Sequence, residues 1–206
     1  MYGGSRYNRE CNTILMDNHL IDFENIEQKL KEAFSSSEYK SLARKVNKAK
    51  RIFLIGNGGL HFVACHAATD MTRLIPDKSV YSFDSVGFIT SNANDHPYDK
   101  LFIRWLDTIA RPEDADESLV IGMSCSGKSK NVLDALVWAQ ENGMDTFMIS
   151  GKSAGVLPES VHELAVNCQY FHTVEVMSLM LFYDLVHRTG NRCPSIDQEI
   201  RRKFDE

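Results

Sequence analysis

The fold is decided by the stretch Arg51-Ile52-Phe53-Leu54-Ile55-Gly56-Asn57-Gly58-Gly59, in which an apolar run ends in a glycine-rich turn. Unbroken apolar runs of this kind are typical of strands buried on both faces of a parallel sheet. A helix-length segment, residues 61–74, follows the turn. The glycines permit positive φ and let a ligand approach backbone N–H groups at the helix start. The G-x-G-x-x-G spacing of dinucleotide sites is absent. A glycine-rich turn without it is often explained by tight packing alone.

Four more short apolar runs, at residues 79–81, 119–121, 146–149 and 164–166, are separated by segments long enough for crossover helices. Upstream, residues 21–49 carry apolar side chains at helical spacing, broken at Ser35-Ser36-Ser37, which predicts two helices or one bent helix. We therefore expect a doubly wound α/β fold that binds its ligand at the carboxyl ends of the strands. A single domain is expected over residues 21–190, with a polar leader at 1–20 and a tail at 191–206.

The composition is that of a globular protein, since 43% of the 206 residues are hydrophobic and 25% are charged. A net charge of −5 argues against a nucleic-acid surface. No apolar run approaches the roughly 18 residues of a membrane span, and the polar N-terminus lacks a signal-peptide pattern. The five cysteines are odd in number, scattered and without a Cys-x-x-Cys pair, which favours reduced thiols. The sequence therefore predicts a cytoplasmic protein with no membrane or nucleic-acid partner.

A second strand-to-helix loop contains Gly122-Met123-Ser124-Cys125-Ser126-Gly127-Lys128-Ser129. Three serine hydroxyls beside a helix N-terminus predict a phosphate-binding loop, because N–H groups and the helix dipole favour negative charge there. The alternative is a serine that merely caps the helix.

The same loop also matches the P-loop pattern G-x-x-x-x-G-K-[ST]. A nucleotide triphosphatase needs in addition an acidic residue on a neighbouring strand to hold Mg²⁺. The downstream candidate, Asp184, lies in an apolar stretch that is more typical of a buried helix. Nucleotide binding through Gly122 to Ser129 is therefore the most distant alternative.

A third block, Ser91-Asn92-Ala93-Asn94-Asp95-His96-Pro97-Tyr98-Asp99, is rich in capping and turn residues. These side chains could equally bind sugar hydroxyls, and Asp95 is the candidate for that contact.

Together and in this order, the three blocks resemble the sugar-isomerase (SIS) domain family, specifically its phosphoheptose isomerase branch. Gly56 to Gly59 is similar to the G-N-G-G-S turn of that branch, with Leu60 in place of the serine. Asn94-Asp95 with Tyr98-Asp99 is similar to its N-D-x-x-Y-D block. The serine loop resembles its G-I-S-x-S-G-N-S phosphate loop, with Lys128 where asparagine is usual.

This resemblance implies a three-layer α/β/α sandwich with a five-stranded parallel sheet, a homotetramer, and a phosphorylated sugar as ligand. It also implies aldose–ketose isomerisation of sedoheptulose 7-phosphate to a heptose 7-phosphate through an enediol. His66 and Asp70 stand where the branch has a histidine and its catalytic glutamate, so Asp70 is the expected base and His66 the expected acid–base or metal residue. The expected substrate and phosphate ligands are Asn57, Gly58, Ser124, Ser126, Ser129, Lys128 and Asp95.

The chain departs from the branch at its zinc site. The glutamine and histidine ligands of the branch are replaced by Val174 and Phe182, which leaves His66 and Asp70 as the remaining candidates to bind zinc. Two ligands make a weak zinc site. The departure favours an alternative from another class, a non-catalytic SIS protein. Such a protein would be a sugar-phosphate sensor, or a protein-binding tetramer like the relative that binds the bacterial replication initiator.

Overall fold

The structure is a computed structural model that describes residues 25–155, 157 and 161–195. It contains a parallel sheet of five strands in the order β2-β1-β3-β4-β5. The strands are β1 (Arg51–Gly56), β2 (Ser79–Ser82), β3 (Ser118–Ser124), β4 (Asp145–Ser150) and β5 (His162–Ala165). All five predicted strands are therefore confirmed, whereas the predicted leader and the tail beyond residue 195 lie outside the described residues.

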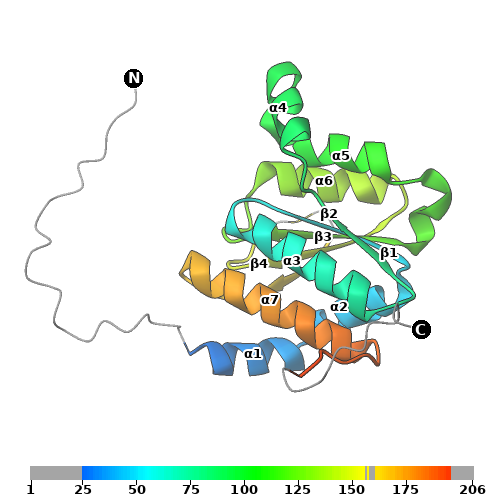
Figure 1. The fold of residues 1–206 in the computed structure, drawn as a ribbon. Helices are drawn as coiled ribbons and strands as arrows, with labels where there is room; N and C mark the ends of the chain where they lie inside the picture. The colour runs from blue at the N-terminus through cyan, green and yellow to red at the C-terminus, as the bar shows by residue number, and fades with distance from the viewer. Residues whose placement is uncertain (1–24, 156, 158–160, 196–206) are drawn as a thin grey trace, which may run out of the picture.

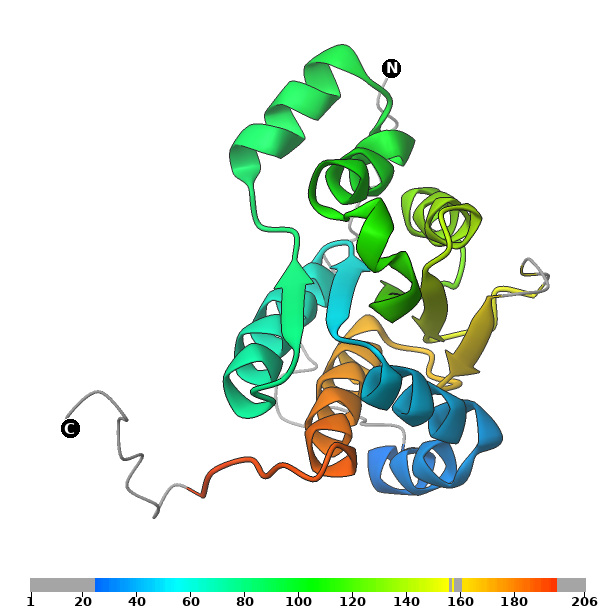
Figure 2. The ribbon, with the colours of Figure 1, turned by 90° about the vertical axis from the view of Figure 1, so that its right-hand side faces the viewer.

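Helices cover both faces of the sheet, as Figure 1 and the turned view of Figure 2 show. One face carries α1 (Ile26–Ser35), α2 (Ser37–Lys48), α3 (Gly59–Leu74) and α7 (Phe171–Arg188), and the other carries α5 (Leu101–Ile109) and α6 (Lys130–Glu141). A further helix, α4 (Val86–Asp95), projects from the body, and short 3-10 helices span Tyr98–Lys100 and Pro112–Glu117. The predicted three-layer α/β/α sandwich is confirmed. Within the described ranges, no helix is long and apolar enough to cross a membrane.

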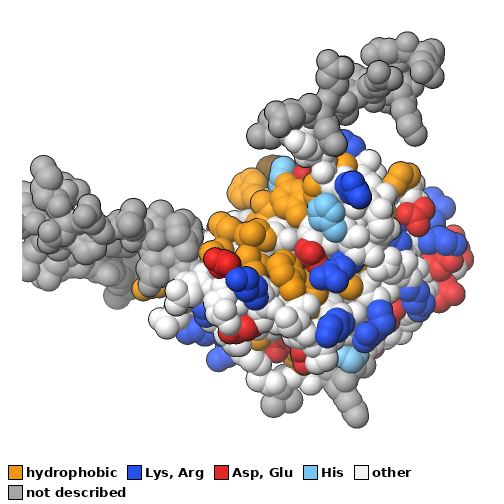
Figure 3. Space-filling view, turned by 90° about the horizontal axis from the view of Figure 1, so that it is seen from below, with side chains coloured by type: hydrophobic (Ala, Val, Ile, Leu, Met, Phe, Trp, Pro, Cys, Tyr) orange, Lys and Arg blue, Asp and Glu red, His pale blue; other side chains and the backbone are white. Residues whose placement is uncertain are grey.

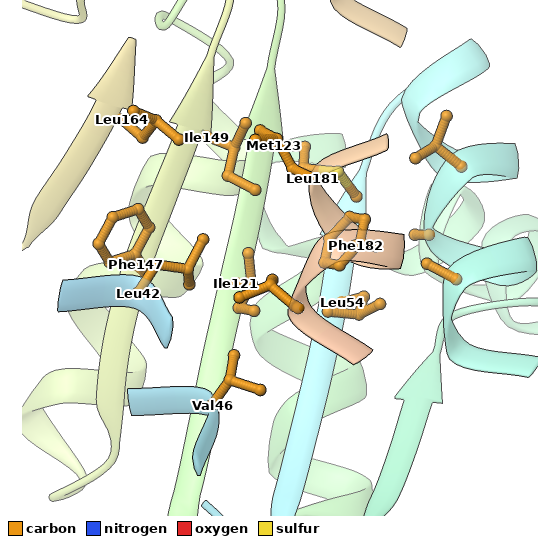
Figure 4. Close-up of a cluster of buried hydrophobic side chains, with 14 of the residues drawn as sticks. Leu42, Val46, Leu54, Ile121, Met123, Phe147, Ile149, Leu164, Leu181 and Phe182 are labelled. Carbon is orange, nitrogen blue, oxygen red and sulfur yellow. The ribbon is translucent and has the colours of Figure 1, made fainter. Parts of the chain in front are cut away.

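The apolar strand runs are explained by burial on both faces of the sheet. In β1, Ile52 and Leu54 face the layer that contains α3 and α7, while Phe53 and Ile55 face α5 and α6. Side chains from β1, β3, β4 and β5 meet α2 and α7 in one cluster (Figure 4). Each large apolar side chain buried in this way stabilises the fold by about 1.5–3 kcal/mol.

The N-terminal helical segment has the predicted break. Ser36 ends α1, and its hydroxyl accepts a hydrogen bond from the backbone N–H of Tyr39 to cap α2. Because the side chain satisfies one of the first N–H groups of α2, it makes Ser36 a helix start rather than a continuation.

The prediction for the third block is wrong in its first half. Most of its Asn and Asp residues form the last turns of α4 rather than a loop. The hydroxyl of Ser85 caps the start of that helix at Phe88, and no proline interrupts it before Pro97. Asn92 is buried, at 2% exposure. A helix cap six residues upstream therefore outweighs the local turn preference of the asparagines.

The strand order creates a place for a ligand. β1 has β2 on one side and β3 on the other, and the chain leaves β1 through α3 and β3 through α6, on opposite faces of the sheet. In open α/β sheets the crevice at such a topological switch point, beyond the carboxyl ends of the strands, is where ligands bind.

The packing of β3 against α6 generates a stability prediction. A Cβ atom on Gly122 would lie 2.7 Å from Cγ1 of Val132 and 3.0 Å from Cδ1 of Leu136. Gly122→Ala should therefore lower the free energy of unfolding by about 1–3 kcal/mol, as overpacking of a core does. Urea denaturation measures this loss.

Gly87→Ala is the matched control for that change. Gly87 lies in the exposed helix α4, where the nearest atom to an added Cβ is 3.9 Å away. The free energy of unfolding should stay the same or rise by about 0.5–1 kcal/mol, because alanine favours a helix more than glycine does. Equal stability of the two variants would show that the β3–α6 contact is looser than the structure has it.

Candidate functional site

A pocket of about 240 Å³ lies at the carboxyl ends of β1 and β3, at the switch point. Its walls come from the turn after β1, the loop after β3 and the first turns of α7. The N-terminal ends of α3, α6 and α7 are close to it, and helix N-termini favour bound anions. The residues that line it are Asn57, Gly58, Gly59, Leu60, Met123, Ser124, Cys125, Ser126, Ser129, Phe171 and Glu175.

The serine loop gathers its hydroxyls at the start of α6. The hydroxyls of Ser124 and Ser129 are 2.8 Å apart, and the backbone N–H of Lys128 donates to the hydroxyl of Ser126 at 3.2 Å. Ser129 occupies the N-cap position of α6, but its side chain does not cap the helix. The capping alternative is therefore not the arrangement that the structure has. The loop can turn this tightly because Gly127, with φ +70°, approaches the carbonyl of Lys152 where a Cβ would clash.

Asn57, in the turn after β1, is held by a small network. Its side-chain amide forms two reciprocal hydrogen bonds of 2.9 Å with Asn131 of α6. The hydroxyl of Tyr98 donates to Oδ1 of Asn57 at 3.0 Å. Asn131 is missing from the sequence-based site, although a buried asparagine one residue inside a helix is a visible signal. The network fixes the orientation of Asn57 toward any ligand in the pocket.

The structure brings together only part of the predicted ligand set. Asn57, Gly58, Ser124, Ser126 and Ser129 all line the pocket. The other two predicted ligands, Lys128 and Asp95, are exposed and are not among the lining residues. Their predicted roles are therefore not supported by the position of their side chains.

The structure also argues against nucleotide binding through a P-loop. Gly122 lies inside β3, so the loop itself begins only after Ser124. Asp184 lies on α7, where Tyr39 donates to its carboxylate at 2.6 Å and Arg188 at 2.9 Å. The carboxylate that would hold Mg²⁺ is therefore on a helix and already engaged.

The predicted catalytic pair lies on α3 in a separate cluster. Nε2 of His66 is 2.7 Å from the hydroxyl of Tyr183, and that hydroxyl donates to Oδ2 of Asp70 at 3.0 Å. Arg73 donates to the other oxygen of Asp70 at 2.8 Å. Burial and then Asp70 raise the pKa of Tyr183. Neither His66 nor Asp70 is among the pocket-lining residues, so the catalytic roles expected for them stay predictions.

The residues present do not fit a zinc ion. Val174 and Phe182 have no donor atoms and are 2% and 1% exposed, in the core cluster that α7 shares with the sheet. Phe182 is seen there in Figure 4. Both oxygens of Asp70 already accept hydrogen bonds. Within residues 25–155, 157 and 161–195, no group of three or more His, Cys, Asp or Glu residues could hold a metal ion.

Glu175 on α7 is a pocket residue that the sequence-based site does not include. Its carboxylate lies directly against Gly59, where a Cβ atom would be 2.1 Å from Oε1. No hydrogen bond or ion pair with another described residue engages that carboxylate. The signal in the sequence is the glutamate at the start of the late helix, but its partner, Gly59, is 116 positions away.

The protein has other pockets besides this one. One of about 160 Å³ shares Asn57 and Gly58 with it and contains His61, whose pKa is lowered by burial. A larger one, of about 410 Å³, lies between α1 and the β5 edge and contains none of the motif residues. The chemistry of the lining side chains, rather than size, therefore identifies the site.

Comparison with known proteins finds relatives in sequence and in fold, although no family model matches the chain. The probable phosphoheptose isomerase of Thermoplasma acidophilum is 31% identical over 121 residues, which is 56% of this chain and 64% of that protein. The phosphoheptose isomerase GmhA of Neisseria gonorrhoeae superimposes with a TM-score of 0.69 at 20% identity, over 82% of this chain and 92% of that one. The chain has the SIS fold of the phosphoheptose isomerases. The resemblance predicted from the three motifs is confirmed.

The same fold occurs in a ligand-binding protein. NanR of Vibrio vulnificus, solved in complex with ManNAc-6P, superimposes with a TM-score of 0.54 at 16% identity, over 81% of this chain and 59% of that one. The match to the Thermoplasma relative spans less than two thirds of that protein. This chain therefore shares its fold both with a named isomerase and with a protein solved in complex with a phosphorylated sugar.

The contact between Cys125 and Glu175 generates a prediction about thiol reactivity. Burial first, and the Glu175 carboxylate second, raise the pKa of Cys125 to about 11. Only the thiolate is nucleophilic, and a thiol with that pKa is about one per cent ionised at pH 9. Glu175→Gln removes the second cause, so the pKa of Cys125 should fall and its alkylation by iodoacetamide at pH 9 should become faster.

Peptide mapping by mass spectrometry follows the alkylation of Cys125 alone. Glu141→Gln, a matched change on the exposed end of α6, is the control and should leave the rate as in the wild type. If Glu175→Gln also leaves the rate unchanged, the two side chains are not in electrostatic contact.

Proposed function

We propose that this chain is a sugar-phosphate isomerase of the phosphoheptose isomerase type, which converts sedoheptulose 7-phosphate to a heptose 7-phosphate. The observation that carries the proposal is the pocket at the switch point, where three serine hydroxyls meet the N-terminus of α6. A reducing cytoplasm is the compartment proposed with it. The described cysteines, Cys65, Cys125, Cys168 and Cys193, form no disulfide with one another.

In this proposal the two walls of the pocket bind different parts of the ligand. The phosphate accepts hydrogen bonds from Ser124, Ser126 and Ser129 and from the first N–H groups of α6. From the turn after β1, the amide of Asn57 binds sugar hydroxyls and is held in place by Tyr98. Uncharged donors and a helix dipole suit a phosphate ester that must also be released after turnover.

The reaction needs a base that removes a proton from the carbon beside the carbonyl, with an enediol as intermediate. Asp70, with His66 in support, remains the candidate from the resemblance, although Arg73 and Tyr183 engage its carboxylate. Because the residues at the zinc position do not fit zinc, the proposal uses no metal. A chelator should leave activity unchanged.

A second candidate function is a non-catalytic sugar-phosphate sensor. The observation that favours it is the loss of ligating and proton-transferring groups at Val174 and Phe182, which are packed into the core. NanR, which has a similar fold, was solved in complex with a phosphorylated sugar. A protein-binding oligomer is a variant of this candidate.

We also propose that the protein is a homotetramer in which other copies cover the outer face of α3 and α7. Phe62 on α3 and Phe171, Val176 and Met180 on α7 are exposed by between 42% and 73%. From the side on which α1 and α7 lie, hydrophobic side chains gather in one part of the surface and charged side chains in another (Figure 3). Exposed apolar patches of this kind are typical of protein interfaces.

The phosphate assignment is tested by Ser126→Ala and Ser129→Ala. Each should weaken the binding of sedoheptulose 7-phosphate about 10- to 100-fold, because a hydrogen bond to a charged group is worth about 1.5–3 kcal/mol. Isothermal titration calorimetry measures the affinity. Ser37→Ala, on the exposed start of α2, is the matched control and should bind like the wild type.

The proposed isomerisation is tested by assaying turnover by the wild-type protein. NMR should show the heptose product from sedoheptulose 7-phosphate, with equal rates in zinc and in a chelator. Saturable binding without turnover would support the sensor instead. Absence of binding would contradict both candidates.

Assembly is tested by the double variant Val176→Asp with Met180→Asp. Two carboxylates on the α7 face should split the oligomer into smaller species, because burying an unpaired charge at an interface is costly. Light scattering after size-exclusion chromatography measures the mass. Val86→Asp, at an equally apolar and 71% exposed position on α4, is the control. A wild type that is monomeric would contradict the proposed tetramer.

A further inference from the structure

We infer that Glu175, rather than Asp70, is the base that moves the carbon-bound proton of the sugar. The inference rests on the proposed function, because it assigns a role within the same pocket.

Position is the first reason. A general base must come within hydrogen-bond reach of the carbon that it deprotonates, while the phosphate stays bound. Glu175 lines the same pocket as Ser124 and Ser126, but from α7 rather than from the serine loop. In a sugar 7-phosphate the carbonyl end is several bonds from the phosphate, so the base has to belong to another wall of the pocket. Asp70 does not line the pocket at all.

The engagement of the two carboxylates is the second reason. Asp70 accepts hydrogen bonds from Arg73 and Tyr183, one on each oxygen, and its side chain is only 14% exposed. To act on a ligand, this carboxylate would first have to give up one of these two hydrogen bonds. The carboxylate of Glu175 has no hydrogen bond or ion pair within the described part of the chain. It is therefore available to a ligand.

The third reason is the space made for this carboxylate. Gly59 is the first residue of α3, and a side chain there would overlap both oxygens of Glu175, at 2.1 and 2.6 Å. The carboxylate thus lies at the N-terminus of α3, where the helix dipole favours negative charge. The same dipoles reduce the repulsion between Glu175 and a bound phosphate.

The proposed step is an ordinary isomerisation and needs no oxidant or reductant. The carboxylate takes the proton from the hydroxyl-bearing carbon beside the carbonyl, and the C–H electron pair becomes the C=C bond of the enediol. The carbonyl oxygen gains a proton from water in the open pocket. The carboxylic acid then returns its proton to the former carbonyl carbon while the other enediol oxygen loses its proton to water and becomes the new carbonyl.

The test separates binding from proton transfer. The probe is sedoheptulose 7-phosphate in D₂O, with affinity from calorimetry and exchange of the carbon-bound hydrogen for deuterium from NMR. Glu175→Gln should bind the probe with an affinity within threefold of the wild type, and its exchange should be at least about 100-fold slower. The control Glu141→Gln should exchange within about threefold of the wild type, and Asp70→Asn should slow the exchange less than Glu175→Gln does.

A second variant tests the position of the carboxylate without removing it. Gly59→Ala should displace Glu175 and slow the exchange, while the melting temperature stays at or above that of the wild type, because alanine favours a helix. Melting curves also confirm that Glu175→Gln and Asp70→Asn are folded.

Exchange in Glu175→Gln within tenfold of the wild type would overturn the inference, as would loss of exchange in a folded Asp70→Asn alone. Binding by the wild type without any exchange would overturn it while leaving sugar-phosphate binding intact. No binding by the wild type would overturn the proposed function and the inference together.

Discussion

The arrangement of this molecule depends on the pairing of β1 with a parallel strand on each side. Because the chain leaves β1 and β3 toward opposite faces of the sheet, the N-termini of α3 and α6 converge on one crevice. Unsatisfied N–H groups and aligned dipoles make that crevice favourable for an anion before any side chain is considered. The serines after β3 and Asn57 after β1 then add specific donors at that place.

The face between α3 and α7 shows how the fold can be kept while a site on it changes. Where the phosphoheptose isomerase branch has polar zinc ligands, this chain has Val174 and Phe182, and both are packed into the core. Burial of such side chains stabilises the fold by about 1.5–3 kcal/mol each. On α3, Tyr183 contacts both His66 and Asp70, and Arg73 donates to Asp70. The result is a packed helix interface where the resemblance implies a metal centre.

Features encoded in short stretches could be predicted from the sequence. The five strands follow from apolar runs, and the serine loop follows from its position between a strand and a helix. The asparagine-rich block could not be assigned in the same way, because the cap at Ser85 extends α4 through it. The roles of Tyr183 and Glu175 depend on how α7 packs against α3, and no local pattern contains that information.

Glycine is needed at positions 58 and 59, in the turn after β1, for two different physical reasons. Gly58 has φ +58°, a conformation that side-chain-bearing residues rarely adopt, and an added Cβ would meet no atom within 4 Å. Gly59 lies in the helix without such strain, and an added Cβ would overlap Glu175. Gly58 therefore allows the backbone to turn, and Gly59 leaves space for the carboxylate of Glu175. A motif that looks purely local thus includes a constraint from a helix more than a hundred residues later, and that constraint leaves room for a carboxylate in the same pocket as the serine loop.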